Sequence, residues 1–166
     1  KGRIIFGPDS APVRLSRHRV QDIDTPEDWL RAEWMFRAMQ AEMASANGVE
    51  GFCYWHYWFG GRRLLERPFE EVLRSGQPDF PFCLGWANES WTGVWNNEPR
   101  RMLIEQTYPG EADDRAHFDY LLKAFSDDRY ITVDDRPLLY IYKPLKLPDA
   151  KRRLDRWREW AHQAGL

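Results

Sequence analysis

Residues 49–59 (VEGFCYWHYWF) form an almost unbroken apolar and aromatic run that starts directly after the helix stop Asn47-Gly48. Residues 80–87 (FPFCLGWA) form a second such run, and residues 137–142 (PLLYIY) form a third. Apolar runs of this length, bounded by Gly, Pro or Asp, are typical of strands buried on both faces. The three segments therefore predict three buried strands.

Helical patterns precede, separate and follow these strands. Thr25 is a typical N-cap residue, and Pro26 with the acidic residues after it is typical of a first helical turn, so a helix is predicted to start there. Asn47-Gly48 is predicted to end this helix near residue 46. Buried strands that alternate with helices favour parallel pairing with right-handed crossovers. We also expect helices over residues 68–73, 111–126 and 148–164, a long loop over 88–101, and a short extra strand over 102–106.

This order predicts an α/β fold, a partial (β/α)8 TIM-barrel-like domain with parallel strands and flanking helices. No Gly-x-Gly-x-x-Gly or Walker-type loop follows any of the strands, which counts against a nucleotide-binding doubly wound sheet. The 166 residues suffice for one domain but fall short of the roughly 250 of a whole barrel. We therefore expect residues 1–166 to be a single domain, a barrel fragment that lacks its first strand and its C-terminal strands. Residues 3–6 (RIIF) could form a short strand of their own.

Composition narrows the possible partners. The net charge is −2 and the pI near 6.1, so no overall field attracts nucleic acid. No apolar run approaches the roughly 18 residues of a membrane span, no signal peptide is visible, and we expect a cytoplasmic location. Cys53 and Cys83 lie within apolar runs and are interpreted as buried thiols, because a disulfide or metal site would need partners that the chain does not offer. We predict neither a metal nor a cofactor.

The aromatic content points to a ligand surface. Five of the nine Trp residues fall within residues 55–95, more than a core of this size needs. In (β/α) barrels, function gathers at the carboxyl ends of the strands. Those ends combine aromatic rings with one imidazole, one carboxylate, one amide and one ammonium, which suits the apolar faces and hydroxyls of a sugar. The predicted substrate-binding residues are His56, Tyr57, Trp58, Trp86, Asn88, Glu89, Trp91, Tyr142 and Lys143.

Each of these residues also has a simpler interpretation. His56 could be a core histidine, Asn88 could cap the segment that follows it, and Lys143 could be solvent-exposed. Trp95 and Tyr108 could cover loops, and Glu105 stays undecided. In the functional interpretation, Trp58, Trp86 and Trp91 form stacking walls, His56, Tyr57 and Lys143 orient hydroxyls, and Asn88 and Glu89 contact hydroxyls near the reacting ring.

Several motifs resemble a known family. Residues 51–59 (GFCYWHYWF), 62–68 (RRLLERP), 80–92 (FPFCLGWANESWT), 103–106 (LIEQ) and 136–144 (RPLLYIYKP) are similar, in this order, to WbsX-type proteins, also described as glycoside hydrolase family 99-like domains. The resemblance covers residues 47–144. It implies a (β/α)8 barrel that acts on glycosidic bonds, often in bacterial surface-polysaccharide or O-antigen pathways.

The resemblance also implies where the catalytic acids belong. The family's opening strand is not recognisable in residues 1–24, and its late Trp-Asn-Glu-Trp-x-Glu-Gly motif is absent. By analogy, that motif holds the acid/base pair, which would lie beyond Leu166, and Glu89 is the best catalytic candidate within the chain. We therefore expect an enzyme that cleaves or transfers glycosyl units on an oligo- or polysaccharide. The alternative is a sugar-binding or scaffold module without turnover.

Overall fold

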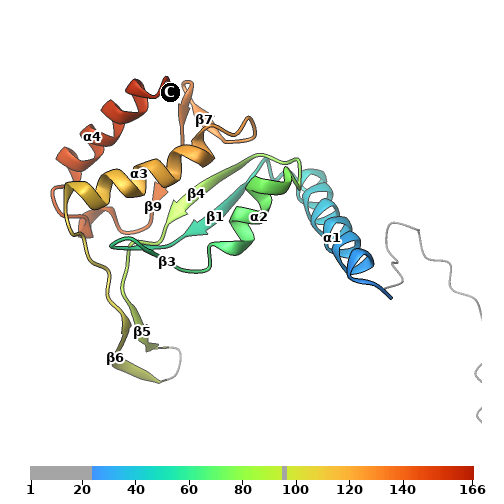
Figure 1. Ribbon diagram of the computed structural model, residues 1–166, viewed down its shortest axis with the longest axis horizontal. Coiled ribbons are helices and arrows are strands. Elements are labelled where there is room, and N and C mark those ends of the chain that lie inside the picture. Colours follow the sequence, from blue (N-terminus) through green and yellow to red (C-terminus); the bar gives the residue numbers. More distant parts are fainter. Residues whose placement is uncertain (1–23, 95–96) are drawn as a thin grey trace, which may run out of the picture.

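A computed structural model describes residues 24–94 and 97–166 (Figure 1). Its central sheet has the order β1-β4-β9, with both neighbouring pairs parallel. The strands are β1 (Phe52–His56), β4 (Phe82–Trp86) and β9 (Leu139–Ile141). The predicted α/β class and parallel pairing are confirmed for this sheet, while a closed barrel is not formed by the residues described.

Four α-helices accompany the sheet. They are α1 (Pro26–Ala46), α2 (Arg67–Ser75), α3 (Glu111–Phe125) and α4 (Ala150–Gln163), with a short 3-10 helix, η3 (Pro144–Lys146), before α4. The α1 helix begins where the sequence predicts, because the Thr25 hydroxyl accepts from the Asp28 amide and the Asp28 carboxylate accepts from the Thr25 amide. The α2 and α3 helices provide the two crossovers, from β1 to β4 and from β4 to β9.

Two tight hairpins interrupt segments that the sequence suggests are continuous strands. Residues 49–59 divide at Tyr57 into β1 and β2 (Trp58–Phe59), and β2 pairs with β3 (Arg62–Arg63) around Gly60 and Gly61. Both glycines have positive φ angles, +55° and +87°, which a turn of the right twist requires. The third predicted strand, 137–142, is shortened to β9, because Pro137 belongs to β8 (Arg136–Pro137), which pairs with β7 (Thr132–Val133).

A third hairpin replaces the predicted loop over residues 88–101. Its strands are β5 (Trp91–Gly93) and β6 (Glu98–Ile104), which pair in antiparallel fashion with irregular register. Figure 1 shows this hairpin extending away from the sheet, beyond the carboxyl end of β4. The extra strand that the sequence places at 102–106 is therefore the second half of a hairpin.

The core lies on the helix-covered face of the sheet. Phe82, Leu84 and Trp86 of β4 are almost fully buried there, against Phe118 and Leu121 of α3. The buried cluster also includes Phe69, Ala124, Phe125, Tyr130, Leu147 and Trp157.

The opposite face of the sheet has no helix over it among the described residues. Trp55 and Tyr140 are each 48% exposed on this face, and Gly85 between them leaves room for both rings. Cys53 is exposed here too, which corrects the prediction that both thiols are buried. Its register partner Cys83 is buried, and burial raises the pKa of the Cys83 thiol to about 12.

The predicted strand at residues 3–6 lies outside the described residues. Within residues 24–94 and 97–166, no helix is both long and apolar enough to cross a bilayer.

Candidate functional site

A groove of about 570 Å³ lies where the carboxyl ends of the three sheet strands meet the β5–β6 hairpin. Its volume falls in the range of roughly 300–1,000 Å³ that small-molecule sites occupy. It is lined by Trp55, Tyr57, Ala87, Glu89, Ser90, Trp91, Thr92, Val94, Leu103 and Tyr142.

Two edge-to-face aromatic pairs build the walls of the groove. Trp55 at the end of β1 meets Tyr142 just after β9, with ring centroids 5.6 Å apart and planes at 84°. Tyr57 meets Trp91 of β5 with centroids 5.0 Å apart and planes at 79°. Each pair therefore joins segments that are distant in sequence, and edge-to-face packing fixes the orientation of the rings.

An ion pair between Glu89 and Lys143 lies beside these rings. The Lys143 ammonium donates to the Glu89 carboxylate, and about a third of each side chain is exposed. The same ammonium lies 5.3 Å from the centroid of the Tyr142 ring. The Glu89 hydrogen bond raises the pKa of Lys143, so the ammonium stays charged. Burial and then the Glu89 charge raise the pKa of the Tyr57 hydroxyl, which keeps it a hydrogen-bond donor.

Asn88 is next to this pair but does not line the groove. Its side chain is 1% exposed. The amide oxygen accepts from the Lys143 backbone N–H at 2.7 Å, and the amide nitrogen donates to the Lys143 carbonyl at 2.9 Å. Asn88 thereby joins the segment after β4 to the segment after β9.

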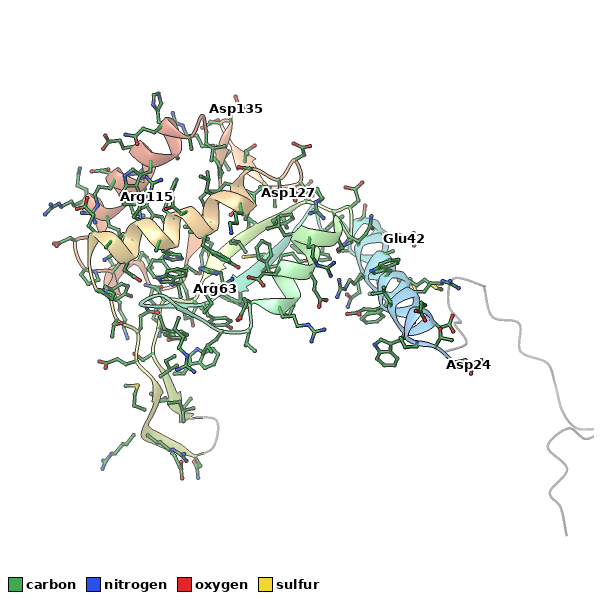
Figure 2. All side chains as sticks on the ribbon, in the orientation of Figure 1. Asp24, Glu42, Arg63, Arg115, Asp127 and Asp135 are labelled. Carbon is green, nitrogen blue, oxygen red and sulfur yellow. The ribbon has the colours of Figure 1, made fainter. Side chains whose placement is uncertain are left out.

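His56 lies on the helix-covered face, away from the groove. Its Nε2 lies 2.8 Å from Nε2 of His117 in α3, and its ring stacks on Tyr120 at 5.3 Å. One imidazole donates and the other accepts, so the accepting ring is neutral in this contact. Burial lowers the pKa of His56 to about 3, with a smaller contribution from the Arg63 charge. Figure 2 labels Arg63, whose guanidinium lies 4.5 Å from the Tyr120 ring centroid.

Trp58 and Trp86 are core residues as well. Trp58 stacks on His117 at 4.6 Å, and its indole N–H donates to Asp113 at 3.1 Å. Trp86 is 1% exposed and stacks on Trp157 of α4. His56, Trp58, Trp86 and Asn88 are thus buried on packed elements and do not line the groove, and their contact with a ligand stays a prediction.

The other five predicted residues come together. Tyr57, Glu89, Trp91 and Tyr142 line the groove, and Lys143 is paired with Glu89. Glu105 is exposed and is not part of the lining. Trp55 also lines the groove, although it is not among the residues predicted from the sequence.

The alternation of side chains along a strand would have identified Trp55. Side chains two residues apart point to the same face, so Trp55 and Tyr57 share one face while His56 points to the other. Applied to residues 54–58, this rule selects the odd-numbered pair for the groove. In the part of the chain that the structure describes, no three His, Cys, Asp or Glu side chains gather as metal ligands would.

The structure thus defines a parallel α/β domain with an aromatic groove and an ion pair at the carboxyl ends of its strands. The chain belongs to the glycosyltransferase WbsX family, whose model matches residues 29–166. The resemblance seen in the sequence motifs is confirmed.

Two relatives carry the name uncharacterized protein WxcX, from the B100 and ATCC 33913 strains of Xanthomonas campestris pv. campestris. Each is 36% identical over 127 residues, which make up 76% of this chain. The chain spans 18% of the length of these relatives. No solved structure matches the chain.

Proposed function

We propose that this chain forms the sugar-binding rim of a carbohydrate-active enzyme that cleaves or transfers glycosyl units in bacterial surface-polysaccharide metabolism. The carrying observation is the groove, in which two aromatic pairs flank the partly exposed Glu89–Lys143 ion pair. Family membership supports a carbohydrate substrate.

The groove offers both kinds of contact that a pyranose ring needs. The C–H faces of the ring are apolar and pack on aromatic rings such as those of Trp55 and Trp91. The sugar hydroxyls donate to the Glu89 carboxylate and accept from the Lys143 ammonium, and charged partners make the stronger hydrogen bonds. A neutral sugar therefore satisfies the ion pair without leaving a charge unpaired.

Glu89 is assigned to hydroxyl binding rather than to proton donation. Most glycoside hydrolysis uses two carboxyl groups on either side of the scissile bond. Glu89 is the one carboxylate among the lining residues that the structure describes, and it is paired with an ammonium. We therefore place the reacting acids in other parts of the full-length protein.

The binding test uses the full-length protein on an array of oligosaccharides prepared from bacterial surface polysaccharides. Trp91→Ala and Trp55→Ala each remove one stacking wall, and we expect binding to the glycans that the unmodified protein captures to fall by about tenfold, or about 1.4 kcal/mol. Trp29→Ala is the matched control, because Trp29 is 64% exposed on α1 and is not part of the groove. Equal loss in the control, or no loss in either groove variant, would contradict the proposal.

A sugar-binding module without turnover is the second candidate, and the Glu89–Lys143 pairing favours it. Released or elongated product, detected by mass spectrometry after incubation of the same glycans with the full-length protein, distinguishes the two. Glu89→Gln removes the charge but keeps the shape, and an enzyme should lose well over tenfold of its activity with it. Glycan binding without any product would favour the module.

A further inference from the structure

We infer that Asn88 and Tyr108 are positioning residues, which hold the ends of β4 and β9 together so that Glu89 and Lys143 meet at the groove. The inference rests on the proposed function for its biological meaning, but the arrangement itself can be tested without a sugar. Neither residue is part of the groove lining.

The first step is the place where the backbone pairing of β4 and β9 stops. The last backbone hydrogen bond between these segments runs from the Tyr142 N–H to the Trp86 carbonyl, at 3.0 Å. Beyond it, the Asn88 side chain takes over, by accepting from the Lys143 N–H and donating to the Lys143 carbonyl. One amide side chain thus satisfies both backbone groups of Lys143. Because Glu89 is the next residue after Asn88, this double contact fixes the separation of the two charged residues.

The second step is the orientation of the Asn88 amide. Its nitrogen also donates to the Tyr108 hydroxyl at 3.2 Å, and that hydroxyl donates in turn to the Asn88 carbonyl at 3.4 Å. Burial raises the pKa of Tyr108, so the hydroxyl keeps its proton. A rotated Asn88 amide would place its oxygen toward the Lys143 carbonyl, where no hydrogen bond forms. Because the Tyr108 hydroxyl gives its proton to the Asn88 carbonyl, it can only accept from the Asn88 side chain, and it therefore favours the same orientation.

The third step is what holds Tyr108. Its ring meets Trp86 edge to face, with centroids 6.0 Å apart, and the Arg153 guanidinium lies 5.2 Å from the ring centroid. Arg153 of α4 is buried and ion-paired with Asp114 of α3. Helices α3 and α4 thus hold Tyr108 in place through Arg153, and Tyr108 in turn holds the Asn88 side chain. The contact of Asn88 with Tyr108 and with the Lys143 backbone is called the clamp below.

The test measures the reactivity of Lys143 toward acetic anhydride in the full-length protein at pH 8, by mass spectrometry of the labelled peptides. Lys146, which is exposed and three residues away, is the internal reference. A lysine held by a carboxylate reacts slowly, because only the unprotonated amine is acylated. In Asn88→Ala the Lys143 ammonium is no longer held at Glu89, so the pKa of Lys143 falls and more of its amine is unprotonated. A fall of one full unit would give about tenfold more free amine, and we expect the Lys143/Lys146 labelling ratio to rise by about threefold or more. Tyr108→Phe removes only the hydroxyl and should raise the ratio less, in the same direction.

Val72→Ala is the matched control for general loosening, because Val72 is a buried residue of α2 away from the clamp. It should lower stability without changing the ratio. An unchanged ratio in Asn88→Ala would overturn the inference, and so would an equal rise in Val72→Ala. If Asn88→Ala does not fold, Tyr108→Phe decides alone, with an unchanged ratio counting against the clamp. The labelling experiment involves no glycan, so its outcome does not depend on sugar binding. A failure to bind glycans on the array would instead contradict the proposed function.

Discussion

His56 and His117 show how the environment of a residue decides its role. His56 stands in an aromatic run at a strand end, where a ligand contact is a reasonable interpretation. Its side chain instead faces α3, where it shares a hydrogen bond with His117, whose ring is enclosed by Trp58, Trp86 and Trp157. Burial lowers the pKa of His117 well below its usual value, with His56 and Arg153 adding to the shift. The pair is therefore part of the core, and burial favours the neutral form of both rings.

This pair predicts acid-sensitive stability. In the unfolded chain, histidine binds a proton below about pH 6.5, whereas folded His56 stays neutral down to about pH 3. The unfolded state then binds more protons between these values. Stability is thus present above pH 6.5 and falls as the pH drops, by about 1.4 kcal/mol per pH unit for His56, and the lowered pKa of His117 acts in the same direction. The measurement is urea unfolding of the full-length protein from pH 7.5 to 4.5.

Variants separate the contribution of the pair from other titrations. His117→Phe removes one titrating ring and should reduce the slope, although it lowers the stability itself. Val72→Ala on α2 removes no titrating group and should keep the original slope while it lowers the stability. A slope that is the same in His117→Phe and in the unmodified protein would show that the pair does not titrate as its burial implies.

At the scale of elements, α3 and α4 are joined by a buried charge cluster. Asp114 of α3 is 1% exposed and receives hydrogen bonds from Arg153 and Arg156 of α4. Two arginines on one carboxylate satisfy a charge that would otherwise be costly to bury. The cluster also supports Tyr108 through Arg153. It therefore connects the packing of two helices to the groove.

Asp114→Ala should cost about 3–5 kcal/mol in free energy of unfolding, because it leaves the buried Arg153 guanidinium without its carboxylate. Glu111→Ala is the control on the same helix, since Glu111 reaches Arg156 at the surface and should contribute less than about 1 kcal/mol. Chemical denaturation of both variants measures the difference. Similar small losses for the two would mean that the cluster does not stabilise the helix pair.

The elements could be predicted from sequence to different degrees, for physical reasons. The start of α1 follows from local chemistry, because Thr25 and Asp28 cap the helix with their own side chains. The β5–β6 hairpin could not be found in this way. Its pairing is irregular, and its strands carry no clear alternation, so only the tertiary structure defines it. Five of the nine predicted site residues converge at the groove, whereas His56 lies on the opposite face of the sheet, because side chains alternate along a strand.

At the scale of the whole molecule, the described residues leave much of the sheet open. In the order β1-β4-β9, the outer strands each have one unpaired edge within the described chain. The face opposite the helices exposes the aromatic rings of Trp55, Tyr140 and Tyr142. Open edges and exposed aromatic faces are the features that other polypeptide segments cover, in a barrel or in an assembly. The relatives, of which this chain spans 18%, have ample further sequence to provide such a cover.

Residues 24–166 expressed alone should therefore self-associate. We expect their apparent mass in size-exclusion chromatography with light scattering to exceed that of a monomer and to rise with protein concentration, because each copy presents two strand edges and an aromatic face. Tyr140→Lys places a charge on that face while sparing the helix-covered core, and it should reduce the association. The full-length protein should not show the same concentration dependence if its further segments cover the sheet. A monomer of residues 24–166 with a cooperative thermal unfolding transition would instead mean that the three-stranded sheet, its hairpins and the four helices fold on their own. The open face would then be a surface of the native protein.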